Sequence, residues 1–322
     1  MRLYHSLFLI FAAINVLCCA CSKNRISPAA TRQITNAATY DINGILFTDS
    51  LHGYMIGGDK YTAAEMQYTS DGGNTWSLYK PAGQWALYGI TSMANKVYTV
   101  GYGGFQYATD AGGNQWQELK HTGYWIFLRQ ITFASANSGF IIAGESYHSG
   151  RLMRIDSLGI VGSCDTFEWE LDDIVFPEAN TGYMCGYGAL QKTTDGGKTW
   201  QLQDIADDYF KSIACIGTEN VWIVGYNGGI VHTSDGGTTW ERQRDGNNPL
   251  KKKYRLRCVR FRDEWTGYAC GDNGLLLKTT NGGKNWIEFE KFTDADLKCL
   301  TLVPDGAIWV AGTNAAAFRI TE

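Results

Sequence analysis

Short apolar runs alternate with polar, glycine-rich turns along almost the whole chain after residue 40. One well-defined stretch predicts four strands, at Leu171–Phe176, Gly182–Gly186, Leu190–Thr194 and Thr199–Gln203. Abundant glycine (38 residues), scarce proline (5 residues) and an aromatic fraction of 13% suit many short strands joined by tight turns. The pattern therefore predicts an all-β protein.

This four-strand unit recurs along the chain. Its clearest marker is the box TTDGGKTW at Thr193–Trp200, and the acid of the box, or its equivalent, repeats every 39 to 46 residues. Four short strands in a repeat of ~40–45 residues are the signature of a β-propeller blade. A seventh copy ends the chain, and the markers of the first six are Asp71, Asp110, Asp156, Asp195, Asp235 and Asn281.

A second signature has the same phase: an aromatic residue, two further residues and a glycine, as in Tyr183–Gly186 and Trp222–Gly225. The seventh copy stops after its third strand, at Phe318–Thr321, whereas residues 30–36 precede the first copy and resemble an outer strand. We therefore predict a seven-bladed β-propeller of four-stranded antiparallel blades, closed by an N-terminal strand. Residues 30–322 form this single domain.

The box itself is expected to be a structural turn. An aspartate that opens a turn accepts hydrogen bonds from backbone N–H groups, and a glycine pair supplies positive φ without steric cost. The tryptophan begins the outer strand and packs between sheets. We therefore do not expect catalysis or metal binding at the boxes.

The first 29 residues lie outside the predicted propeller. The apolar run Leu7–Leu17 is too short to span a bilayer and is typical of a secretory signal. Ala20 followed by Cys21 resembles a bacterial lipobox, so we predict a lipoprotein signal peptide over residues 1–20, lipidation of Cys21 and a tether over residues 21–29. The protein would then be held in the cell envelope on a bacterial membrane. An ordinary cleaved signal is the alternative, and Cys18 and Cys19 leave the cleavage position open.

Neither a metal site nor a cofactor is expected. The four histidines of the mature chain are scattered, and there is no Cys-x-x-Cys pair. Six cysteines remain after the signal, at strand positions that repeat between blades, which favours small buried side chains over disulfides. They are Cys164, Cys185, Cys215, Cys258, Cys270 and Cys299.

The segments GYMCGYGALQKTTDGGKTW (182–200), VWIVGYNGGIVHTSDGGTTW (221–240) and GYACGDNGLLLKTTNGGKNW (267–286) resemble the repeats of Asp-box (BNR) propellers. They are most similar to the photosystem II stability/assembly factor family and its bacterial relatives. This resemblance implies a seven-bladed propeller that acts as a non-enzymatic assembly or interaction factor. Asp boxes also occur in sialidases, but the Arg-Ile-Pro segment of sialidases is absent here.

Glycoside hydrolysis by two carboxylates is the least favoured function. Asp172 and Asp173 are the only centrally placed acidic pair, and neighbours on a strand are expected to point to opposite faces. Ligands of propellers are instead met at one rim and at the mouth of the channel.

The rim predicted from the sequence is basic and aromatic. Alignment of the innermost strands places Asn43, Tyr88, Arg129, Asp172, Lys211, Arg257 and Lys298 in one ring, and nine basic residues against one acid lie between Arg242 and Arg262. Solvated charges, with aromatic residues packed beneath their own loops, are the plainer interpretation. The candidate partner-binding residues are Arg129, Lys211, Lys251, Lys252, Lys253, Arg255, Arg257, Lys298 and Trp125.

These features favour a membrane-anchored, non-enzymatic scaffold or assembly factor that binds a protein partner. A partner with an acidic surface is compatible with the basic rim. A carbohydrate-binding module for an anionic glycan is the alternative. Nucleic acid is disfavoured because the predicted signal would export the protein.

Overall fold

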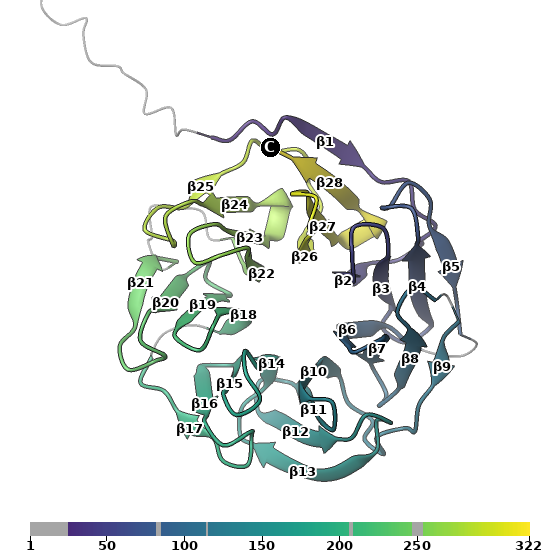
Figure 1. Ribbon diagram of the computed structural model, residues 1–322, viewed down its shortest axis with the longest axis vertical. Coiled ribbons are helices and arrows are strands. Elements are labelled where there is room, and N and C mark those ends of the chain that lie inside the picture. The colour runs from purple at the N-terminus through teal and green to yellow at the C-terminus, as the bar shows by residue number, and fades with distance from the viewer. Residues whose placement is uncertain (1–24, 82–84, 114, 206–208, 247–253) are drawn as a thin grey trace, which may run out of the picture.

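The computed structural model describes residues 25–81, 85–113, 115–205, 209–246 and 254–322. Its strands form seven four-stranded antiparallel sheets arranged as blades around a central opening (Figure 1). The predicted fold class is confirmed. Blade three is present as well, although its marker Asp156 is followed neither by a glycine pair nor by a tryptophan.

Each blade runs from an innermost to an outermost strand. Blade one contains β2 (Ile42–Phe47), β3 (Gly53–Asp59), β4 (Ala63–Thr69) and β5 (Ser77–Tyr79). Blade two contains β6 (Leu87–Met93), β7 (Lys96–Gly101), β8 (Gln106–Asp110) and β9 (Gln117–Glu118). Blade three contains β10 (Leu128–Ser135), β11 (Ser138–Glu145), β12 (Ser149–Ile155) and β13 (Val161–Phe167).

The remaining blades follow the same order. Blade four contains β14 (Leu171–Val175), β15 (Gly182–Gly186), β16 (Ala189–Thr193) and β17 (Gln201–Leu202). Blade five contains β18 (Phe210–Ile216), β19 (Asn220–Gly225), β20 (Ile230–Thr233) and β21 (Glu241–Arg244). Blade six contains β22 (Leu256–Phe261), β23 (Gly267–Gly271), the 3-10 turn η1 (Asp272–Gly274), β24 (Leu276–Thr279) and β25 (Ile287–Glu288).

Blade seven closes the ring with both ends of the chain. It contains β26 (Leu297–Leu302), β27 (Ile308–Gly312), the 3-10 turn η2 (Thr313–Ala315), β28 (Ala317–Thr321) and, as its outermost strand, β1 (Ala30–Gln33). β1 pairs antiparallel with β28, with Ala30 opposite Thr321 (Figure 1). The predicted closure by an N-terminal strand is therefore confirmed, and it covers the edge that β28 would otherwise expose.

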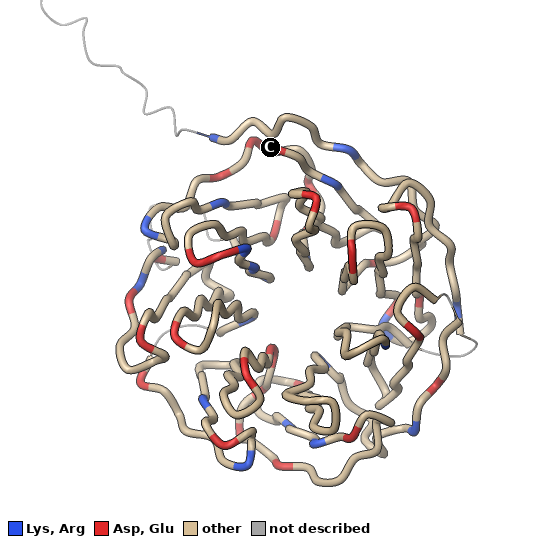
Figure 2. Tube along the Cα trace, in the orientation of Figure 1, with Lys and Arg blue, Asp and Glu red and all other residues tan. Residues whose placement is uncertain are grey.

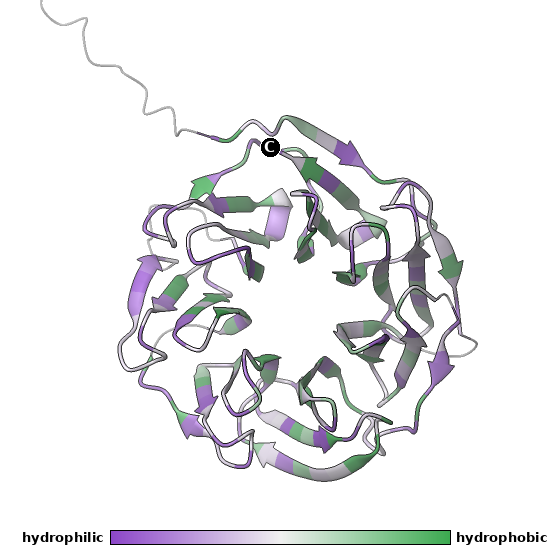
Figure 3. Cartoon of the chain, viewed as in Figure 1, coloured by the Kyte–Doolittle hydropathy of each residue, from purple (hydrophilic) through white to green (hydrophobic). Residues whose placement is uncertain are grey.

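The hydrophobic core lies between neighbouring blades. The second strands of the blades are almost wholly buried, whereas outermost strands such as β9 and β21 are polar, as Figure 3 shows. Between blades five and six, for example, Trp222 and Val224 pack against Val259 and Leu277. Because each sheet buries both faces against its neighbours, loss of one blade would expose a core face of each blade beside it.

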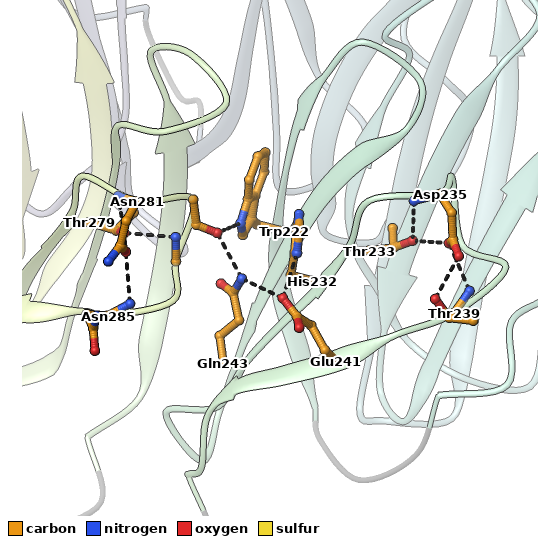
Figure 4. Close-up of polar contacts among 12 residues, drawn as sticks. Trp222, His232, Thr233, Asp235, Thr239, Glu241, Gln243, Thr279, Asn281 and Asn285 are labelled. Carbon is orange, nitrogen blue, oxygen red and sulfur yellow. Dashed lines mark hydrogen bonds and ion pairs between the residues drawn. The ribbon is translucent and has the colours of Figure 1, made fainter.

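The boxes are hydrogen-bonded turns, as their sequence predicts. Asp195 Oδ1 accepts bonds from the backbone N–H groups of Lys198 (3.0 Å) and Thr199 (2.9 Å), and Thr193 Oγ1 accepts one from Gly197 N–H (2.9 Å). At Asp71 and Asp235 the bond from the backbone N–H four residues on recurs, as does the bond from the second glycine to the threonine Oγ1, and Asn281 accepts the first of these with its amide oxygen (Figure 4).

The two repeated signatures bind each other across blades, which the sequence pattern did not reveal. The signature aromatic of one blade reaches the box turn of the next. The Tyr183 hydroxyl donates to the Gly236 carbonyl (3.1 Å), the Tyr54 hydroxyl to the Gly113 carbonyl (3.2 Å), and Trp222 Nε1 to the Gly282 carbonyl (3.1 Å). Each box therefore anchors its own turn and the preceding blade.

The box aspartates should make stability depend on pH. Hydrogen bonds from the side chain and backbone of Thr239 hold the pKa of Asp235 at about 2, and equivalent threonines hold the pKa values of Asp71 and Asp195 well below the ordinary range. Below about pH 4 the unfolded chain binds more protons than the folded one, so the free energy of unfolding should fall as pH falls toward 2.

We expect the combined substitutions Asp71→Asn, Asp195→Asn and Asp235→Asn to leave the fold intact, because Asn281 already serves in blade six, and to flatten this pH dependence. Denaturant unfolding between pH 5 and pH 2 measures the slope. An identical slope in the substituted protein would contradict this role of the carboxylates.

Candidate functional site at the channel mouth

A β-bulge aims one side chain of every blade toward the central channel. The pairing of the first two strands shifts register at the same place in all seven blades, for example between Leu128 and Gln130 and between Leu171 and Asp173. Such a bulge leaves one residue unpaired and redirects its side chain. The bulged residues line a cavity of about 250 Å³ and are the ring expected from the alignment, namely Asn43, Tyr88, Arg129, Asp172, Lys211, Arg257 and Lys298.

The same bulge explains the glycine of the second signature. A Cβ on Gly186 would overlap the Glu170 carbonyl oxygen, and one on Gly312 would overlap the Asp296 carbonyl oxygen. In these blades the carbonyl of the residue that precedes the innermost strand occupies the space that a side chain would need, and glycine permits this close approach. Blade three has Ala143 at the equivalent position.

Acidic residues accompany the basic members of the ring. Lys211 Nζ lies 2.7 Å from Asp172 Oδ1, and Lys298 Nζ lies 2.7 Å from Asp41 Oδ2. Arg129 forms an ion pair with Glu170 of the next blade. These contacts join one blade to the next, as the box contacts do on the opposite face.

Arg257 is the fourth basic residue of the ring that forms ion pairs. Its Nε lies 2.5 Å from Asp272 Oδ1, and its Nη2 lies 3.4 Å from Asp296 Oδ2. Arg255, 3.9 Å from Asp272, brings the ion-paired basic residues described at the mouth to five, and their partners are five acids. Figure 2 accordingly shows acidic beside basic segments around the opening. Four of these acids were not expected from the sequence, although three of them lie two residues before a ring residue. The four are Asp41, Glu170, Asp272 and Asp296.

The centre of the mouth is a buried ionic cluster. Burial raises the pKa of Asp172 against the effect of Lys211 and Arg129, and burial lowers the pKa of Lys211. One oxygen of Asp172, Oδ2, is buried and accepts no hydrogen bond from any residue that the structure describes. A buried carboxylate oxygen is costly without a donor, so this position suits a donor from a bound partner.

Asp172 and Asp173 do not point to opposite faces, and that expectation is wrong. Because Asp172 occupies the bulge, both carboxylates line the channel cavity. Asp173 has a structural role, because its carboxylate accepts hydrogen bonds from the backbone N–H groups of Ile174 and Ile213, each 2.9 Å.

Aromatic side chains surround the mouth on the same face. Four tyrosines from blades three to five follow one another with ring centroids 5.2 Å (Tyr147–Tyr187), 5.3 Å (Tyr187–Tyr209) and 6.0 Å (Tyr209–Tyr226) apart. We call them the tyrosine track. Three of them are 42–51% exposed, and Arg255 lies 4.0 Å over the ring of Tyr226. Exposed aromatic and arginine side chains are enriched at protein interfaces.

Trp125 belongs to a second aromatic group on this face. It is 64% exposed and contacts Trp85, with ring centroids 5.2 Å apart. Trp85 in turn contacts Tyr102 (5.6 Å), whose ring lies 4.6 Å from that of Phe127. The aromatic residues thus do not all pack beneath their own loops.

Several expected features lie outside the described residues, namely Lys251, Lys252, Lys253 and the lipidation candidate Cys21. Part of the expected tether is described and lies against blade six, because Ile26 N–H donates to the Glu288 carbonyl (3.0 Å). All six cysteines beyond the signal carry free thiols. Among the described residues there is neither a cluster of three metal-ligating side chains nor a helix long and apolar enough to cross a membrane.

Comparison with known proteins agrees with this architecture. A family model described as Photosynthesis system II assembly factor YCF48 matches residues 164–247 and 206–298. Among solved structures, YCF48 bound to D1 peptide has a TM-score of 0.73 at 16% identity, covering 92% of this chain and 99% of that one. YCF48 from Cyanidioschyzon merolae has a TM-score of 0.71 at 15% identity, covering 91% and 99%.

Enzymes share the fold as well. A catalytically inactive virginiamycin B lyase from Staphylococcus aureus has a TM-score of 0.72 at 12% identity, covering 91% of this chain and 99% of the lyase. No curated protein matches the chain. At these identities the structures show the fold alone, and fold does not determine chemistry. With its boxes, its seven blades and the family match together, the chain is an Asp-box (BNR) repeat β-propeller that resembles the photosystem II stability/assembly factor family.

Proposed function

We propose that this protein is a non-enzymatic scaffold that binds an extended segment of a protein partner across the mouth of the channel. The tyrosine track is the observation that carries the proposal. It offers rigid aromatic surface along three consecutive blades, beside the unsatisfied Asp172 oxygen. Such surfaces supply the anchors of protein interfaces at little cost in side-chain entropy.

The balance of charges favours contacts made by aromatic rings and hydrogen bonds over simple attraction of an acidic partner. The five described basic residues are matched by five acids, and Asp172 Oδ2 would accept a bond from a lysine, an amide or a backbone N–H. Lys251, Lys252 and Lys253, which lie outside the described residues, are close in sequence to Arg255 and Arg257, so an acidic partner surface stays within the proposal. Similarity to YCF48, of which one structure carries a D1 peptide, supports a protein or peptide partner.

An anionic glycan is the second candidate. The exposed indole of Trp125 favours it, because a flat aromatic face can stack on a sugar ring. The paired charges of the mouth favour it less, since each ring cation already has an acidic neighbour.

The proposal includes a lipid anchor at Cys21. Ile26 pairs with blade six, so a lipidated Cys21 would be separated from the docked chain by four residues. Five residue steps span at most roughly 17 Å. The anchor would therefore hold the outer edge of blade six close to the membrane surface of the cell envelope.

Site-specific photocrosslinking in the parent cell tests the binding face. A photoreactive phenylalanine derivative replaces Tyr187 or Tyr226 in the tyrosine track, and in matched controls it replaces Leu158 on the box face or Leu202 on the outer edge. All four side chains are exposed. We expect a common crosslinked protein partner at the two track positions, with much lower yield at the two controls.

A further inference from the structure

We propose that the cleft between blades five and six on the box face binds a neutral saccharide or a similar polyhydroxylated ligand. This site is independent of the proposed partner surface, which lies at the other face of the ring. The cleft encloses about 390 Å³, within the range of small-ligand pockets. It is lined by His232, Trp240, Glu241, Glu264, Trp265 and Lys284, among others.

The cleft lies at a position that varies between blades. On the third strand of blades three and four, the residue opposite the signature aromatic reaches the next blade. Lys192 Nζ donates to the Gly236 carbonyl (2.6 Å), and Arg154 Nη2 donates to the Gly197 carbonyl (2.6 Å). In blade five this position is His232, whose shorter side chain leaves space between the blades.

The neighbouring box is satisfied without His232. The Gly282 carbonyl accepts bonds from Trp222 Nε1 (3.1 Å) and Gln243 Nε2 (2.8 Å) instead (Figure 4). The fold therefore does not require a histidine at this position. Its presence leaves a side chain that can serve another purpose.

Two contacts hold the His232 ring in one orientation and leave its Nε2 without a hydrogen-bond partner among the described residues. Its ring stacks on Trp222 at 4.6 Å, and Nδ1 lies 3.0 Å from Glu241 Oε1 (Figure 4). The residue is only 8% exposed, and Nε2 has no hydrogen-bond partner among the residues that the structure describes. Because Nδ1 donates to the carboxylate, Nε2 of the neutral ring is an acceptor for a buried ligand hydroxyl.

The donor in the cleft comes from Lys284, not from Trp240. Trp240 lines the cleft, but its indole packs toward blade four, against the buried cluster that includes Tyr183 and Val231. The ammonium of Lys284 lines the same cleft as the free Nε2 of His232. An acceptor and a donor lining one cavity suit a hydroxyl group, which accepts and donates at once.

The outer wall of the cleft suits a sugar ring. Trp265 is 55% exposed and lies on the turn between β22 and β23. Its backbone N–H donates to Asp263 Oδ1 (2.8 Å), which holds the turn. Its flat apolar face can cover the C–H face of a sugar. Glu264 and Lys284 can bond to hydroxyls at the rim. With two carboxylates against one ammonium, the lining disfavours an anionic ligand.

Saturation-transfer NMR on the folded protein tests the site with cellotriose, maltotriose, chitotriose and xylotriose, and with trigalacturonate as the charged probe. We expect at least one neutral trisaccharide to bind, and its affinity to fall about tenfold or more in Trp265→Ala and in His232→Lys. The lysine restores the residue type of blades four and six and fills the cleft, so the fold should be kept; thermal unfolding checks this.

Leu202→Ala, at the exposed outer edge of blade four, is the control and should bind the sugar unchanged. The inference is overturned if no neutral probe binds, if binding survives both cleft substitutions, or if trigalacturonate binds as tightly as the best neutral probe. None of these outcomes bears on crosslinking at the tyrosine track, so the two proposals fail separately.

Discussion

Deletion of residues 30–36 is expected to lower the free energy of unfolding by about 3 kcal/mol or more. The deleted segment supplies the outermost strand of blade seven and the side chain of Ile34, which is only 6% exposed. It also joins blade seven to blade one, since Arg32 Nη2 donates to the Gly73 carbonyl (3.2 Å). Denaturant unfolding measures the loss.

The exposed edge of β28 should also promote association, because an uncovered strand edge pairs with other chains. Size-exclusion chromatography before unfolding detects such species. Thr31→Ala is the matched control: Thr31 is an exposed residue of β1, and its loss should change stability by less than about 0.5 kcal/mol. An unchanged unfolding midpoint in the deleted protein would rule out closure by this strand.

The substitution Gly197→Ala is expected to cost about 3 kcal/mol. Gly197, the second glycine of its box, has φ +80°, and a Cβ there would lie 2.6 Å from Phe140 Cζ. Alanine at such a φ costs about 1–2 kcal/mol, and overlap with a packed core ring costs a similar amount. Phe140 cannot move away easily, because it is fully buried and stacks on Phe176 at 4.7 Å.

Gly188 in the same blade separates the two effects. It has φ +68°, and a Cβ there would meet nothing within 4 Å. Gly188→Ala should therefore cost only the backbone strain, about 1 kcal/mol. If both substitutions cost the same, the close packing of the box against the preceding blade contributes nothing, and the box is only a turn.

Features that repeat could be predicted from the sequence. The count of blades, the closing strand and the hydrogen-bonded box all follow from local patterns that appear several times. Blade four illustrates this, because three of its four strands lie within one residue of the expected bounds. Its outer strand is shorter than expected, since Thr199 and Trp200 still belong to the box turn.

Contacts between blades could not be predicted in this way. Tyr183 reaches Gly236, 53 residues along the chain, and no local pattern states that an aromatic residue of one blade caps the box of the next. The bulge is equally hidden, although it decides that Asp172 and Asp173 share the channel. The acids Glu170 and Asp296 were available in the sequence, but their pairing with Arg129 and Arg257 depends on the curvature of the ring.

The proposed sites consist of residues that vary between blades. A tyrosine follows the signature glycine in blades two, four and five, as Tyr102, Tyr187 and Tyr226, which is a sequence signal that could have indicated the aromatic face. His232 offers no such signal until the structure shows that the equivalent residues of other blades span to a neighbour. Repetition thus identifies the scaffold, and departures from it identify candidates for binding.

The photocrosslinking map tests the central claim most directly. The claim is that recognition occurs at the channel mouth, along the tyrosine track, while the boxes serve the fold. It predicts that one protein partner is captured from positions 187 and 226 and that yields at positions 158 and 202 are far lower. Equal yields at all four positions, or capture confined to the two controls, would contradict it.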